Sequence, residues 1–383
     1  MKKNRIDLSR ITTSGNFIPE IDGLRFIAII SVVLFHLYGF ISEKDGSTYT
    51  TNYNFDFIAN FLKNGNFGVE LFFVLSGFIL GLPFAKHHLL KEKKVSLKSY
   101  FYRRVSRLEP PYIIVMFLLL LGVIFVSKNY NTSEAIQSFL ASITYTHNFI
   151  YGKDILPLIN TVAWSLEIEI QFYILAPVLS LLFSISNKIN RRSILILLTL
   201  SFSVISLFLK LPFISILDYL HYFLLGFLLV DLFLIEKVKK KTSLLRNTLT
   251  VLSLLLIFSC NKNQLSSDIH KIIWNISLLI LIFGSYYNVI LYKSLKFFSL
   301  KIITNIGGMC YSIYLLHFAI ISFAGNPLLT FQFSEDSIIN IGLYSIIILG
   351  CILVISALFF IVIERPCMDK NWPIKIKKIW KRN

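Results

Sequence analysis

Long apolar segments recur along the whole chain and are separated by short polar connections. Of 383 residues, 55% are hydrophobic and 15% are charged, whereas soluble domains carry about 25% charged residues. A helix needs about 20 apolar residues to cross the hydrocarbon layer of a membrane. The sequence therefore predicts an all-α, polytopic integral membrane protein with about ten transmembrane helices. The expected spans are residues 21–41, 66–85, 109–127, 161–185, 194–209, 216–235, 247–260, 271–291, 304–325 and 337–363.

The net charge of +17 is distributed unevenly between the connections. Of the 38 Lys and Arg residues, 31 lie in alternate connections that share one side with both termini. The positive-inside rule then places both termini in the cytoplasm. Topology accounts for the basic charge, so nucleic-acid binding is not expected. The basic residues of the outer side are Lys44, Lys63, Lys128, Lys153, Lys210, Lys262 and Lys271.

We expect a single membrane domain over residues 1–383. Within it, residues 1–20 form a cytoplasmic N-terminal segment and residues 364–383 a basic cytoplasmic tail. The outer-side connection 128–160 is interpreted as an external cap or a partly inserted helix. No paired cysteine spacing predicts a disulfide framework or a metal site. The four cysteines are Cys260, Cys310, Cys351 and Cys367.

Two ionisable residues of the first span are the main candidates for chemistry. Arg25 and His36 are eleven residues apart, so a helix places them on the same face about 16 Å apart. Ionisable groups inside a bilayer cost about 2.5–3.5 kcal/mol each on insertion scales, so each needs a reason. Packing or proton handling could explain His36, and its alignment with Arg25 favours proton handling. Arg25 would then form a cytoplasmic anion site.

The segment before the third span reads RRVSRLEPPY. Arg104 and Arg107 are three residues apart and are neighbours on a helix face. They could be ordinary cytoplasmic anchors, or they could clamp a phosphorylated ligand, because guanidinium groups match phosphate bidentately. We expect Pro110 and Pro111 in the first turn of the span, where a missing N–H costs little.

The fourth span begins WSLEIEIQFYILAP and carries two carboxylates. Ser165, Glu169 and Tyr173 follow at four-residue intervals and share one helix face. Glu167 points about 200° away from Glu169 and could be interfacial. For Glu169, a polar cavity or a partner such as His36 is the better explanation.

Further polar residues lie in other spans. Glu70 and His317 could approach the same outer-half cavity as His36. The pair Ser76-Gly77 indicates close helix packing, and Glu364 is interpreted as part of a membrane-end anchor.

Six strings of this chain closely resemble the acyltransferase-3 family of membrane acyltransferases and occur in the family's order. They run from residue 21 to 366 and read IDGLRFIAIISVVLFH, FGVELFFVLSGFIL, RRVSRLEPPY, WSLEIEIQFYILAP, CYSIYLLH and IERP. Arg25 and His36 match its arginine–histidine motif, Arg104 and Arg107 its paired arginines, and Glu169 its tryptophan–serine–leucine motif. The sequence departs at Ile170, where relatives often have a second acidic residue, and at Glu167, which occupies a normally small position.

The resemblance implies an enzyme of a bacterial cytoplasmic membrane. It would transfer an acyl group, usually acetyl, from cytoplasmic acyl-CoA to a hydroxyl of a glycan or lipid-linked saccharide such as O-antigen or exopolysaccharide. It implies His36 and Glu169 as catalytic residues. Arg25, Arg104 and Arg107 would bind acetyl-CoA. The acceptor would contact Trp164, Ser165, Glu70 and His317.

Some relatives carry a fused extracytoplasmic SGNH hydrolase-like domain. None is expected here, because the chain ends about 20 residues after the last expected span, so a separate extracytoplasmic partner is possible. No metal or redox cofactor is expected.

Buried His and Glu also build proton relays, so a proton-coupled transporter or exporter is the alternative function. A membrane assembly protein without catalysis is a third.

Overall fold

The computed structural model describes residues 8–11, 17–44, 56–126, 131–236, 242–259, 267–335, 337–369 and 371–372. This part of the chain is helical, without a strand, as the sequence predicts. The predictions for Lys128, Lys262 and Cys260, and for the tail from residue 373, lie outside the described residues. The helices are α1 (Pro19–Lys44), α2 (Asp56–Lys63), α3 (Gly68–Leu90), α4 (Leu97–Phe125), α5 (Thr132–Ile143), α6 (His147–Tyr151), α7 (Trp164–Leu179), α8 (Lys188–Phe208), α9 (Ile216–Ile235), α10 (Leu244–Ser259), α11 (Asp268–Tyr292), α12 (Lys301–Gly308), α13 (Cys310–Leu328), α14 (Ser337–Phe359) and α15 (Arg365–Cys367).

The predicted polytopic membrane architecture is confirmed. Eight helical segments of the described residues are long and apolar enough to cross a membrane. The bent pair α12–α13 makes a ninth span if it is counted as one. The remaining expected span, 247–260, corresponds to α10, an apolar helix of 16 residues that is about 24 Å long.

The helix α4 begins earlier than expected. It starts at Leu97, where the Ser96 side chain caps it, and continues through Pro110 and Pro111. The expectation that both prolines open a helix is therefore wrong. Pro110 has no N–H for the carbonyl one turn earlier, and that carbonyl, of Ser106, accepts a 2.8 Å hydrogen bond from the Trp372 indole instead.

The expected continuous span 304–325 is broken. Helices α12 and α13 meet at an angle of 70° on either side of Met309. A side chain at Gly307 would lie 1.7 Å from the backbone oxygen of Asp22. Glycine therefore lets the end of α12 pack directly on the backbone of α1, and the chain turns there into α13.

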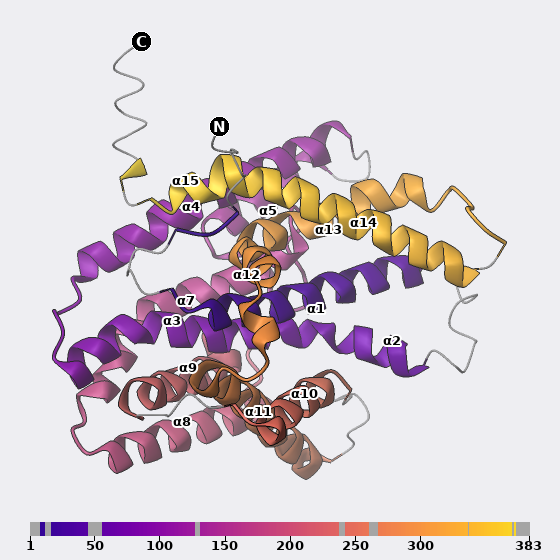
Figure 1. The fold of residues 1–383 in the computed structure, drawn as a ribbon. Helices are drawn as coiled ribbons and strands as arrows, with labels where there is room; N and C mark the ends of the chain where they lie inside the picture. The colour runs from indigo at the N-terminus through magenta and orange to yellow at the C-terminus, as the bar shows by residue number, and fades with distance from the viewer. Residues whose placement is uncertain are drawn as a thin grey trace, which may run out of the picture.

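Two clusters of buried apolar side chains organise the bundle. The first joins α3, α8, α9 and α11, and the second joins α4, α13 and α14. Figure 1 shows α8, α9 and α11 on one side of a central layer that contains α1 and α3, and α4, α13 and α14 on the other side. Residues of α1 belong to both clusters, so α1 lies at the seam between them. Side chains that leave α1 can reach both groups of helices.

Close packing within the first cluster depends on small residues. A side chain at Gly77 would lie 2.2 Å from the backbone oxygen of Phe223, and one at Gly226 would lie 2.3 Å from that of Val74. The backbones of α3 and α9 are therefore in direct contact. This agrees with the packing role expected for Gly77.

The connection 128–160 contains α5 and α6, with α5 packed against α4. The buried faces of α5 include Ala135 and Ser138. On the bundle side, the Tyr112 hydroxyl donates to the Ser142 carbonyl over 3.0 Å. The connection is therefore anchored on the bundle over the described part.

Candidate active site

The first part of the site is a cluster of arginines near the start of α1. The buried Asp22 accepts hydrogen bonds from Arg25 Nη1 at 2.7 Å and from Arg10 Nε at 2.9 Å. Burial, together with the nearby charge of Arg25, lowers the pKa of the Arg10 guanidinium to about 9. One carboxylate thus holds two cations that repel each other. The arginine cluster, as used below, comprises Arg10, Arg25, Arg104 and Arg107.

Arg104 and Arg107 join this cluster from α4. The Arg104 guanidinium lies over two tyrosine rings, 5.8 Å from the centroid of Tyr100 and 5.6 Å from that of Tyr173. Arg107 interacts electrostatically with Arg25 and Glu364. Its Nε is buried without a hydrogen-bond partner among the described residues. A buried guanidinium N–H of this kind is suited to an anionic ligand.

Glu364 was not expected here, and its interpretation as an interfacial anchor is wrong. Its side chain is 1% exposed. One carboxyl oxygen accepts hydrogen bonds from the backbone N–H and the hydroxyl of Ser312. Ser312 lies in the first turn of α13, where the helix dipole favours a negative charge. The break at Met309 creates this helix start, which a continuous span would not have supplied.

Glu169 does not hydrogen-bond to His36. Its Oε1 accepts from the Tyr173 hydroxyl at 2.6 Å and from the Ser76 hydroxyl at 2.9 Å. The predicted shared face of Glu169 and Tyr173 is confirmed, because the two are one helical turn apart. The Tyr173 ring also lies beneath the Arg104 guanidinium, so Tyr173 connects the Glu169 carboxylate to Arg104.

His36 instead faces His317 of α13. His317 Nδ1 lies 3.0 Å and 2.9 Å from the carbonyl oxygens of Ile313 and Tyr314. Carbonyl oxygens only accept, so this nitrogen carries the proton of a neutral ring and Nε2 is left as an acceptor. His317 Nε2 lies 3.0 Å from His36 Nδ1. His36 Nδ1 must therefore donate, and His36 Nε2 keeps its lone pair.

Ser165 extends this network to α7. Its Oγ lies 2.7 Å from the Tyr314 hydroxyl oxygen. The Tyr314 hydroxyl donates to the Val162 carbonyl, so Ser165 donates to Tyr314. The Tyr314 backbone carbonyl in turn accepts from His317. A continuous set of contacts therefore joins α7, α13 and α1.

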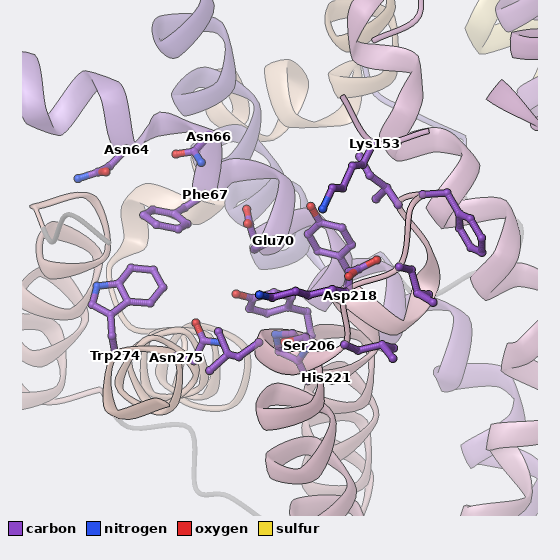
Figure 2. Close-up of a pocket in the computed structure, with 18 of the residues that line it drawn as sticks. Asn64, Asn66, Phe67, Glu70, Lys153, Ser206, Asp218, His221, Trp274 and Asn275 are labelled. Atoms are coloured by element: carbon purple, nitrogen blue, oxygen red, sulfur yellow. The ribbon is translucent and has the colours of Figure 1, made fainter. Parts of the chain in front are cut away.

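A cavity of about 710 Å³ lies beyond His36, between the starts of α3 and α9 and the helix α11. Figure 2 shows Glu70 projecting toward its centre, with Trp274 on one side and Lys153 on the other. Trp164, another expected acceptor residue, is half-buried and packs at 5.7 Å against the ring of Tyr219, which lines the cavity. Glu70 and Trp164 thus lie at the cavity, whereas His317 and Ser165 lie in the histidine network.

The sequence analysis did not assign Asp22 or Glu364 to the site, and it did not predict the contact between Tyr173 and Arg104. It also did not predict that Lys63, Lys153 and Lys210 line one cavity. The sequence spacing could have indicated Asp22, because residues three apart are neighbours on a helix face and Asp22 is three residues before Arg25. For Glu364 the signal was its place in the family-like string IERP, but its partner Ser312, 52 residues away, could not be inferred from it. Among the described residues, no group of three or more His, Cys, Asp or Glu side chains could hold a metal ion.

Together, the fold and the site define a polytopic membrane protein in which one helix, α1, carries both a histidine paired with His317 and an arginine of the arginine cluster. A family model described as an acyltransferase domain matches residues 18–362. The chain belongs to this acyltransferase-3 family.

Several curated relatives of this chain are named as O-acetyltransferases. A Staphylococcus aureus (strain COL) protein, SACOL0978, provisionally named an O-acetyltransferase, is 29% identical over 80% of this chain and 51% of its own length. The peptidoglycan O-acetyltransferase OatA of Listeria monocytogenes is 32% identical over 44% of this chain and 25% of its own length. The chain thus spans about half the length of the first of these relatives. No solved structure matches it significantly.

Proposed function

We propose that this chain is an O-acetyltransferase of the bacterial cytoplasmic membrane. It would move an acetyl group from acetyl-CoA to a hydroxyl of a glycan or lipid-linked saccharide, such as peptidoglycan, O-antigen or an exopolysaccharide. The observation that carries this proposal is the lone pair that the contact with His317 leaves on His36 Nε2. The family and the names of its relatives support the reaction class.

The donor would bind through its phosphates at the arginine cluster. Guanidinium groups recognise phosphate bidentately, and Arg107 Nε is buried without a partner among the described residues. Arg25 and His36 are eleven residues apart on one helix, which corresponds to about 16 Å. The extended arm of coenzyme A would run along this face of α1 and bring the thioester to His36.

The transfer step then follows from which ring nitrogen of His36 carries the proton and which one accepts. His36 Nε2 accepts the proton of the acceptor hydroxyl while the hydroxyl oxygen attacks the thioester carbonyl carbon. A C–O ester bond forms and the C–S bond breaks. The thiolate leaves as coenzyme A and receives the proton from His36. His317 is a positioning residue, because it fixes the proton on His36 Nδ1 without contacting the substrate.

For Glu169 we propose a role other than the expected partnership with His36. Its contacts with Tyr173 and Ser76 assign it to holding the ring beneath Arg104. We therefore propose that Glu169 positions the donor-binding arginine rather than polarising His36. The acetyl group would be passed on by this membrane domain itself or with a separate extracytoplasmic partner.

The decisive experiment uses the full chain in proteoliposomes with radiolabelled acetyl-CoA and a glycan acceptor. His36→Ala should lower the rate of label transfer about 10²- to 10⁴-fold, the usual contribution of a general base. His317→Ala should lower kcat with little change in the KM for acetyl-CoA. The exposed His270 supplies the matched control, and His270→Ala should retain the wild-type rate.

Folded and inserted His36→Ala protein with the wild-type rate would reject the proposal. The same assay separates the alternative function, because a proton-coupled transporter would transfer no label to the glycan with any variant.

A further inference from the structure

Three lysines from distant connections meet at the cavity. Lys63 ends α2, Lys153 follows α6, and Lys210 lies between α8 and α9. They are three of the seven basic residues that the charge pattern assigns to the outer side. Their convergence on one cavity from three connections is the observation to be explained. The lysine cavity, as used below, is the space lined by Lys63, Lys153 and Lys210 together with Glu70, Tyr219 and Trp274.

The cavity carries more positive than negative charge, because three lysines line it against two carboxylates, Glu70 and Asp218. Asp218 lines the same cavity, but it accepts hydrogen bonds from the backbone N–H and the hydroxyl of Ser215 at the start of α9. Like charges in a concave site repel each other and concentrate a positive potential. The lysines that form ion pairs among the described residues are Lys86, Lys271 and Lys293, all outside this cavity.

The walls of the lysine cavity have the character of a saccharide site. Ligand pockets of about 300–1,000 Å³ combine aromatic surfaces with a few fixed polar groups. Trp274 and Tyr219 supply aromatic rings here. Asn64 and Asn275 each donate from the side-chain amide to a backbone carbonyl, at 2.9 Å and 3.3 Å, which fixes their orientation. Figure 2 shows Asn275 beside Trp274 and Glu70 opposite them.

One side chain joins the lysine cavity to the histidine pair. Phe35 lines the cavity, and its ring centroid lies 5.0 Å from that of His36. On the other wall, Tyr219 packs against Trp164 of the helix that carries Glu169. A ligand in this cavity would therefore be one side chain, that of Phe35, away from the proposed general base.

We propose that the lysine cavity binds the acceptor and selects an anionic saccharide, one that carries a carboxylate or a phosphate. The lysines bind the anionic group at the rim. Trp274 and Tyr219 contact the apolar faces of the sugar rings, and Glu70 accepts from hydroxyl groups. This inference rests on the proposed function in one respect, namely that the bound saccharide is the acyl acceptor.

Direct binding tests the selectivity without any reaction. The probes are a neutral N-acetylglucosamine oligosaccharide and the same oligosaccharide bearing a carboxylate or a phosphate, each with a fluorescent label. We expect the full chain in nanodiscs to bind both anionic probes about 10- to 100-fold more tightly than the neutral one, as charge-assisted contacts imply. Lys63→Gln, Lys153→Gln and Lys210→Gln together should remove this preference and leave neutral binding within about twofold.

A second triple variant controls for net charge. Lys91, Lys93 and Lys94 lie in the connection between α3 and α4, outside the cavity, and their replacement by Gln should keep the preference. Equal binding of the probes to the wild type, or a preference that survives in the cavity variant, would overturn the proposal. A preference that depends on the cavity lysines, together with unimpaired transfer by His36→Ala, would instead reject the proposed function and uphold the saccharide site.

Discussion

The arginine cluster and the lysine cavity are both positively charged, but they are built differently. Arg10 and Arg25 are held by the buried Asp22, and Arg104 lies on tyrosine rings. The side chains of Lys63 and Lys153, in contrast, are exposed and come from the ends of short elements. A buried carboxylate fixes arginines of the first site, whereas the lysines of the second site are exposed, and the Lys63 ammonium lies over the ring of Tyr38, 5.9 Å from its centroid.

This difference in construction determines which ligands each site can recognise. Fixed guanidinium groups suit one small anion of constant shape, such as the phosphates of a nucleotide donor. Lysine ammonium groups on flexible stems can follow an anionic group at several positions. A saccharide acceptor varies in length and conformation, so adaptable contacts suit it better. The comparison therefore separates donor from acceptor by the construction of the site.

Among the changes that test this comparison of the two sites, the largest effect is expected at Arg107. Arg107→Lys keeps the charge but loses the planar fork, so kcat/KM for acetyl-CoA should fall nearly as far as with Arg107→Ala, about 10- to 100-fold. In the lysine cavity the reverse change, Lys210→Arg, should alter the acceptor KM by less than about twofold. Steady-state kinetics with each substrate varied in turn measures both. Full activity of Arg107→Lys would break the distinction between the two sites.

The local part of this arrangement could be predicted from the sequence. Arg25 and His36 share a helix, as do Glu169 and Tyr173, and helical geometry fixes their relative directions. The pairing of Tyr173 with Glu169 is a direct result of that geometry.

The long-range part could not be predicted. His36 and His317 are 281 residues apart, and nothing in either helix specifies the other as its partner. The hypothesis that Glu169 contacts His36 failed for the same reason, because Ser76 of α3 is the nearer side chain. The bend at Met309 depends on the contact between Gly307 and α1, which hydropathy does not report.

An intermediate effect is expected at Asp22, where the sign of the change is informative. Simple charge counting predicts that Asp22→Asn tightens binding of an anionic donor, because a negative charge is removed. If fixed geometry matters more, the released Arg10 and Arg25 should bind the donor less well, and the KM for acetyl-CoA should rise about tenfold. Acceptor KM should not change.

Loss of a buried ion pair also lowers stability, typically by about 3–5 kcal/mol when one partner is removed. Asp231→Asn supplies the control, because Asp231 of α9 is likewise buried and holds Arg191 and Arg192. Both variants should unfold at lower temperature, but the donor KM should rise only with Asp22→Asn. A lower donor KM with Asp22→Asn would show that charge, rather than geometry, governs the cluster.

The smallest expected effect is the response to salt, and it probes both sites in the unmodified protein. The Debye length falls from about 10 Å at 0.1 M to about 3 Å at 1 M ionic strength, and exposed charges are screened more than buried ones. Lys63, Lys153 and Lys210 are exposed, so the KM for an anionic acceptor should rise severalfold over this range. The donor KM should change by less than about twofold, because the side chains of Arg10 and Arg25 are only 12% exposed and are held by short hydrogen bonds. A neutral acceptor provides the internal reference, since its KM should not depend on salt. If donor and acceptor KM values rose in parallel, the two sites would differ in location but not in the way they bind an anion.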